Sequence, residues 1–195
     1  MVEDLRVVIE DLNALAAICS TVMIVESNHN SALDEWIHDI GYNPKRDPKQ
    51  SKIYYLLNYL FADAVDNGNE KTALQLAFDN LDQFELLPPL ADNVVFGRKD
   101  QAYIVAGWDL SCHGHHGQNG ATGSASQFKR WQIPMITGHT HSPLIDYGRN
   151  PLLTVGVTAS LDQGYNRGGA STWNQSHAVI FHDGTGQIVP CRGLY

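Results

Sequence analysis

The apolar residues of the first half of the chain recur at helical spacing. Steps of three and four residues predict an amphipathic helix over about residues 3–18. Its apolar positions are Leu5, Val8, Ile9, Leu12, Leu15 and Ala16. The same spacing over Ile53–Ala64 predicts a second helix, and a further helix is expected over about residues 71–81. Between them, the β-branched run Thr21–Val25 predicts a short buried strand.

The residues after this strand predict the start of another helix. Ser31-Ala32-Leu33-Asp34 has the spacing of a capping box, in which the serine and the acidic side chain satisfy backbone N–H groups at a helix N-terminus. We therefore expect a helix to begin at Ser31.

The pattern changes after Pro88-Pro89. Short apolar runs separated by Gly-containing segments predict strands of a sheet. These runs cover residues 94–96, 103–106, 134–136, 152–155 and 178–181. Asp183-Gly184 predicts the turn of a closing hairpin with Ile188-Val189. Helices followed by many strands predict an α/β or α+β layered domain.

The length of 195 residues favours one domain with a sizeable core. We expect this domain to cover residues 1–195, with a mostly helical half at 1–92 that includes a strand at 21–26, and a strand-rich half at 93–195. A hydrophobic content of 43% and a charged content of 17% exclude a mainly disordered chain. No apolar run reaches the ~20 residues that span a bilayer, and the N-terminus does not resemble a signal peptide. We therefore expect a cytoplasmic protein with no membrane partner.

Charge differs between the two halves. The formal net charge is −8, with a large acidic excess in residues 1–96 and a small basic excess in residues 97–195. Acidic helix surfaces are common and need no partner, whereas a mildly basic second half suits a ligand that carries phosphate. The acidic balance excludes a dedicated basic DNA-binding domain. Three widely spaced cysteines without a CxxC pair predict reduced thiols.

Five of the nine histidines fall in two short clusters, Cys112–His116 and Gly138–His141. Each cluster follows a predicted strand, and strand ends of α/β sheets face the ligand crevice. A His-x-His pair on extended backbone places both imidazoles on one face, where they can approach one ion or two adjacent ions. Imidazole suits Zn, Mn, Fe, Ni and Cu. The sequence therefore predicts a metal site, whereas the isolated His38, His177 and His182 are expected to be structural.

Three motifs resemble the calcineurin-like metallophosphoesterases when taken in chain order. They are Ser27-Asn28-His29-Asn30 after the first strand, His113-Gly114-His115, and Gly138-His139-Thr140-His141. They are similar to the last three motifs of that superfamily: Gly-Asn-His followed by an acidic residue, a strand-end His, and Gly-His-x-His. Cys112–Ser124 and Ser160–Asn166 resemble its phage-encoded branch. The resemblance covers residues 3–190 and implies an α/β fold, part of a four-layer α/β/β/α sandwich that lacks its first β-α-β segment.

The resemblance implies the roles of five residues. Asn28, His113 and His139 match ligands of one metal ion, and His141 matches a ligand of a second ion. His29 matches the histidine that contacts the phosphate and protonates the leaving group. The implied activity is phosphodiesterase or nuclease hydrolysis of a phosphate ester, such as DNA or a nucleotide, by a metal-bound hydroxide. Mn²⁺ is the expected ion, Zn²⁺, Fe²⁺ and Ni²⁺ are compatible, and up to two ions would bind.

Three further residues are expected to support the site. His115 would orient neighbouring ligands, and Asp109 would accept a hydrogen bond from a metal-bound imidazole. Arg167 would meet the phosphate of the substrate. If the chain is encoded by a phage, the bacterial host cytoplasm is its expected location.

Two motifs of the family are absent. The chain contains no Asp-x-His and no Gly-Asp, which supply the bridging carboxylate and its neighbours in the family. We therefore expect a portion of a larger or split enzyme, completed by a homo-oligomer or by a separate chain. One alternative is a catalytically inactive truncated remnant that acts as a binding or interaction protein. Another is a single zinc ion held by Cys112 and the clustered histidines.

Overall fold

The computed structural model describes residues 2–39, 41–98, 101–117, 119, 121–162 and 171–191. The chain divides into two compact units. Unit 1 comprises Met1–Ile24 and Asn28–Gly97, and unit 2 comprises Val25–Ser27 and Arg98–Tyr195. None of the helices in the described residues is long and apolar enough to cross a membrane.

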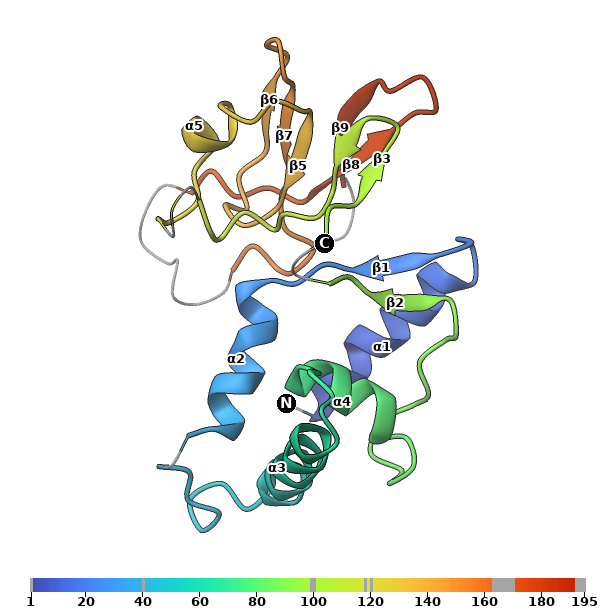
Figure 1. Ribbon diagram of the computed structural model, residues 1–195, viewed down its shortest axis with the longest axis vertical. Helices are drawn as coiled ribbons and strands as arrows, with labels where there is room; N and C mark the ends of the chain where they lie inside the picture. The colour runs from blue at the N-terminus through green and yellow to red at the C-terminus, as the bar shows by residue number, and fades with distance from the viewer. Residues whose placement is uncertain are drawn as a thin grey trace. The chain divides into compact units, whose positions relative to one another are not determined.

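Unit 1 is a helical layer on a two-stranded parallel sheet (Figure 1). Its elements in chain order are α1 (Val2–Ala16), β1 (Val22–Ile24), α2 (Asn28–Ile37), α3 (Ser51–Asp66), α4 (Ala73–Asn80) and β2 (Val94–Phe96). Helix α1 packs on β1 and β2, and α4 packs on α2 and α3. The helical spacing of apolar residues produces this core because it places them on one face of each helix. The core residues are Ile9, Leu33, Ile37, Ile53, Leu57, Ala73, Ala77, Phe78, Leu81 and Leu87.

The structure corrects the helix start that the sequence predicted at Ser31. Helix α2 begins at Asn28, so Ser31 lies inside it and caps nothing at that position. Asp34 instead accepts a hydrogen bond at 2.7 Å, through Oδ1, from the backbone N–H of Ala73 at the first turn of α4. The capping box of this unit is formed by Thr72 and Gln75 at the same helix end. Three side-chain acceptors, on Asp34, Thr72 and Gln75, therefore satisfy backbone N–H groups at the N-terminus of α4.

Unit 2 contains a five-stranded mixed sheet with strand order β3-β4-β5-β7-β6. Its strands are β3 (Ile104–Val105), β4 (Trp108–Asp109), β5 (Met135–Thr137), β6 (Leu144–Asp146) and β7 (Leu152–Thr154). The three central strands, β4, β5 and β7, are mutually parallel, and the two outer strands are antiparallel to their neighbours. The short helix α5 (Ala125–Phe128) packs on β7.

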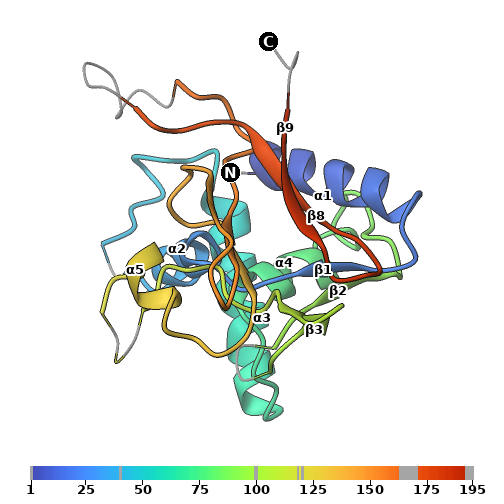
Figure 2. The same cartoon turned by 90° about the horizontal axis from the view of Figure 1, so that it is seen from above.

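A separate hairpin completes the described part of unit 2. Strands β8 (Ser176–Ile180) and β9 (Gly186–Pro190) pair antiparallel and are drawn in red in Figures 1 and 2. The expected turn at Asp183-Gly184 is confirmed, because Gly184 adopts a φ of +83° between the two strands. Trp108 is buried and donates from its indole Nε1 to the Gly184 carbonyl at 2.8 Å. The mixture of helices and sheets confirms the α/β class expected from the sequence.

Replacing Asp34 with Ala should lower the free energy of unfolding by about 1–2 kcal/mol, because the fully buried Ala73 would lose the acceptor for its amide. Ala has a higher helix propensity than Asp, but this offsets only a few tenths of a kcal/mol of the lost stability. Urea unfolding followed by circular dichroism measures the change. Asp11→Ala, at an exposed position of α1, is the matched control and should shift the value by less than about 0.5 kcal/mol. Equal losses in the two variants would contradict the role of Asp34.

Candidate functional site

Two histidine-bearing loops meet at one edge of the unit 2 sheet. Strands β4 and β5 are parallel, so their carboxyl ends lie at the same edge, and each is followed by one of the loops. The backbone N–H groups of Gly138 and His139 both donate to the carbonyl oxygen of His113, at 2.9 and 3.0 Å. The two histidine segments therefore contact each other through their backbones.

Three imidazoles gather where the loops meet. The ring centroids of His113 and His139 are 5.5 Å apart, those of His113 and His115 are 5.5 Å apart, and those of His115 and His139 are 6.2 Å apart. We call these three residues the histidine cluster. The Nδ1 atoms of His115 and His139 are buried. The ring of His116 lies 4.1 Å from that of His115 and adds a fourth imidazole at the exposed margin.

Two glycines allow the first loop to fold this closely. Gly114 has a φ of +102°, and a Cβ atom there would lie 3.1 Å from Cβ of Thr137. A Cβ atom on Gly123 would lie 1.8 Å from the carbonyl oxygen of Gly114, which is closer than any side chain can approach. The N–H of Gly123 donates to the carbonyl of His115 at 3.0 Å. Gly114 and Gly123 therefore allow the backbone of the first loop to pack closely on Thr137 and on itself.

His141 is held differently from the histidine cluster. It has a φ of +57°, a conformation that costs a non-glycine residue roughly 1–2 kcal/mol. Its ring packs edge-on against Trp173, with centroids 4.5 Å apart and an interplanar angle of 79°. The backbone N–H of Asn174 donates to the His141 carbonyl at 3.2 Å. This hydrogen bond holds the segment that carries Trp173 beside the second histidine loop. No pattern in the sequence indicated that Trp173 is the partner of His141.

Asp109 and Cys112, two further residues that the sequence analysis singled out, contact neighbouring side chains. Asp109 is buried, and its Oδ1 accepts hydrogen bonds from the backbone N–H and the hydroxyl of Ser111 at 2.8 and 2.6 Å. Its expected role in orienting an imidazole remains a prediction. Cys112 packs against an apolar group formed by Phe128, Met135 and Leu152. Burial raises the pKa of the Cys112 thiol. The single-zinc site built on Cys112 remains a prediction.

Three expected site residues belong to unit 1 or lie outside the described residues. Asn28 and His29 are the first two residues of α2, belong to unit 1 and are exposed. The histidine cluster and His141 belong to unit 2. Arg167 lies outside the described residues. The roles that the resemblance implies for these residues remain predictions.

The donor chemistry of the histidine cluster suits a divalent transition metal, because neutral imidazole binds Mn, Zn, Fe and Ni. Within residues 2–39, 41–98, 101–117, 119, 121–162 and 171–191, no three His, Cys, Asp or Glu side chains stand in positions that could hold a metal ion. The rings are therefore ligands of a suitable type whose arrangement does not by itself complete a metal site.

Comparison with known proteins shows similarity to a bacteriophage protein. Over 171 residues, which is 87% of this chain, the sequence is 37% identical to Protein A1 of Escherichia phage T5. The matched segment is 29% of that protein, so the chain spans less than a third of the length of this relative. No family model matches the chain, and no solved structure matches it.

Replacing Gly123 with Ala should disrupt the histidine cluster, because the new methyl group would collide with the backbone of Gly114. We expect a loss of more than about 2 kcal/mol of stability or a displaced first loop, seen as altered imidazole proton resonances. Gly68→Ala is the matched control. Gly68 adopts a positive φ, of +67°, and has open space around its Cβ position, so about 1 kcal/mol should be lost with the histidine resonances unchanged. Unaltered resonances and stability in Gly123→Ala would refute the close approach.

Proposed function

We propose that this chain is the histidine-bearing portion of a metal-dependent phosphoesterase that hydrolyses phosphodiesters of nucleic acids or nucleotides. The observation that carries the proposal is the histidine cluster, three imidazoles from two loops at the carboxyl ends of neighbouring parallel strands. Catalytic groups of open α/β sheets are commonly found at this edge. The ordered motifs of the sequence support the same assignment.

His113 and His139 would hold a divalent ion, and His115, in the same cluster, would orient the other two. A bound divalent ion supplies Lewis-acid activation of water and neutralises charge on the phosphoryl group. The protein's contribution is to fix the imidazoles. The carbonyl of His113 receives two backbone hydrogen bonds from the second loop, which limits the movement of the two loops relative to each other.

The remaining ligands would come from outside the described residues or from another chain. The family motifs that supply carboxylates, Asp-x-His and Gly-Asp, are absent from the sequence. In phage T5 the matching segment belongs to a protein more than three times as long, which has room for further ligands. We propose that the unit 2 sheet is part of the layered α/β/β/α sandwich of such an enzyme, completed by those additional residues.

The outer strands of the unit 2 sheet favour a partner. Ile104 and Val105 of β3 are 53% and 52% exposed, and Ile145 of β6 is 43% exposed. Exposed apolar side chains on outer strands leave an edge at which another strand can pair. A second copy or a separate chain docked at such an edge would supply the missing carboxylates.

A second candidate function is a catalytically inactive remnant that binds a partner. It is favoured by the same absence of carboxylate motifs, together with the absence of a complete metal-holding group in the described part of the chain. The two candidates differ in whether the histidine cluster takes up metal.

His139→Ala should reduce Mn²⁺ affinity by at least about 100-fold, because it removes one imidazole from the cluster. Elemental analysis after equilibration with Mn²⁺ and dialysis gives the metal content per chain. His182→Ala, an exposed histidine in the β8–β9 turn, and Cys112→Ala are the matched controls and should keep the native content. Equal metal in the native protein and in His139→Ala would contradict the assignment of ligands. A native protein without metal would support the inactive remnant.

Hydrolysis should depend on the same histidine. With Mn²⁺ present, the native chain should release nitrophenol from bis-nitrophenyl phosphate, and His139→Ala should abolish the release while His182→Ala retains it. If the native chain gives no turnover at any Mn²⁺ concentration although it binds the ion, the missing carboxylates are required for catalysis. Turnover that His139→Ala leaves intact would overturn the proposed site.

A further inference from the structure

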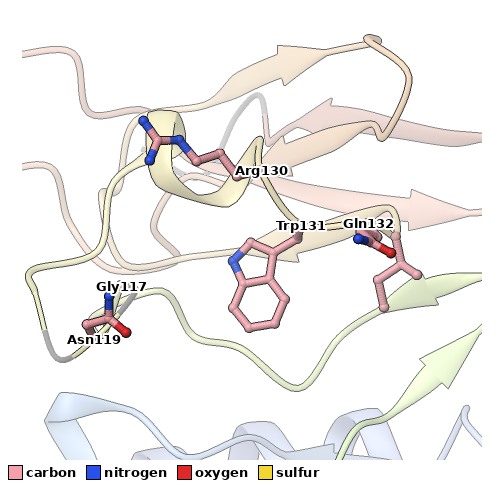
Figure 3. Close-up of a pocket in the computed structure, with 6 residues that line it drawn as sticks. Gly117, Asn119, Arg130, Trp131 and Gln132 are labelled. Atoms are coloured by element: carbon pink, nitrogen blue, oxygen red, sulfur yellow. The ribbon is translucent and has the colours of Figure 1, made fainter.

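Unit 2 contains a second recognition feature, a pocket next to α5. It has a volume of about 790 Å³ and opens to solvent. Figure 3 shows the indole of Trp131 between Asn119 on one side and Gln132 on the other, with the side chain of Arg130 lying along α5. The lining residues are Gly117, Asn119, Arg130, Trp131, Gln132 and Ile133.

Trp131 offers an aromatic surface on a fixed backbone. Its side chain is 42% exposed, which is unusual for the largest apolar residue. Its N–H donates to the Phe128 carbonyl at 3.0 Å, and its carbonyl accepts from Nδ2 of Asn150 at 2.9 Å. The backbone is thus held from two sides while the ring remains accessible. A ring presented in this way stacks on a flat ligand at little cost in conformational entropy.

The pocket carries positive charge without a carboxylate among its lining residues. Lys129 is engaged outside it, since Nζ lies 2.5 Å from Oδ2 of Asp146. Arg130 is exposed, and no carboxylate in the described part of the chain forms an ion pair with its guanidinium. The amides of Asn119 and Gln132 add hydrogen-bond donors and acceptors. A guanidinium suits phosphate, and amides suit the edges of nucleobases.

The pocket and the histidine cluster share one loop. Gly117 lies in the hairpin that also carries His115, and its N–H donates to the Ala121 carbonyl at 2.7 Å. A Cβ atom on Gly117 would collide with the Gln127 side chain, so the hairpin packs directly on α5, which leads into Arg130 and Trp131. A ligand in the pocket would therefore lie against the loop that presents the histidines.

We propose that this pocket binds one nucleotide of a single-stranded nucleic acid, with the base stacked on Trp131 and a neighbouring phosphate contacting Arg130. The role of the pocket as a substrate-positioning subsite rests on the proposed phosphodiesterase function, whereas the binding itself needs no metal. Stacking on an exposed aromatic ring requires an unstacked base, which single strands supply and duplexes do not.

The test measures binding of a short fluorescein-labelled oligothymidylate by fluorescence anisotropy in the presence of EDTA. Trp131→Ala should weaken binding by about tenfold or more, and Trp131→Phe should retain most of it. Arg130→Gln should weaken binding and lower the slope of log affinity against log salt by about 0.7, the value for one phosphate contact with a single strand. The duplex of the same sequence should bind more weakly than the single strand.

Matched controls come from exposed residues of unit 1: Tyr59→Ala for the aromatic ring and Arg46→Gln for the charge. Both should bind as the native protein does. Competition with thymidine monophosphate shows whether the pocket takes a free nucleotide instead, and competition with inorganic phosphate shows whether it reads phosphate alone. If either competitor binds with the same affinity as the oligonucleotide, the single-strand assignment is overturned.

The outcome separates this inference from the proposed function. Oligonucleotide binding that is unchanged in both Trp131→Ala and Trp131→Phe would refute the subsite even if Mn²⁺-dependent hydrolysis is found. Binding that Trp131→Ala abolishes, in a protein that takes up no Mn²⁺ and shows no hydrolysis, would support the subsite and reject the catalytic proposal. Circular dichroism of each variant confirms that the fold is retained.

Discussion

The parallel pairing of β4 and β5 is the interaction on which the candidate site depends. Parallel strands end at the same edge of a sheet, so this pairing brings together two loops that are about 25 residues apart in sequence. The carbonyl of His113 then receives two N–H groups from the second loop, and the imidazoles of the histidine cluster follow from that backbone contact. The glycines of the first loop are a consequence of the same closeness, since a side chain at Gly123 would meet backbone.

Much of the fold could be predicted because local patterns decide it. Helices α1, α3 and α4 form within a few residues of their expected bounds, since the apolar spacing matches the buried face of each helix. Strand β2 and the β8–β9 hairpin also agree with their apolar runs and turn residues. The start of α2 was predicted wrongly because the Asp34 side chain has a tertiary partner, the amide of Ala73, which local spacing cannot reveal. Strands β4 and β6 were missed, since two or three residues carry too little periodicity.

The sequence indicates the residues of the candidate site more clearly than the contacts between them. Spacing and flanking glycines identified the histidines, and the topology explains why they converge. The backbone at Gly114 is not extended, however, so the proximity of His113 and His115 arises from a turn and not from strand alternation as expected. The contact of His141 with Trp173 depends on a left-handed backbone conformation that no sequence pattern indicated. Trp131 and Arg130 carry no motif, and only the folded loop shows that they line the same pocket.

The β1–β2 pair of unit 1 has a kinetic consequence. These strands pair in register, Val22 opposite Val94, across a stretch of chain that contains α2, α3 and α4. Closing so long a loop costs entropy before any contact between the strands compensates for it. Helices need only local contacts, and their formation shortens the path between the strands. Unit 1 is therefore expected to fold in a definite order, with its helices gathering around Leu57 and the parallel pair closing last.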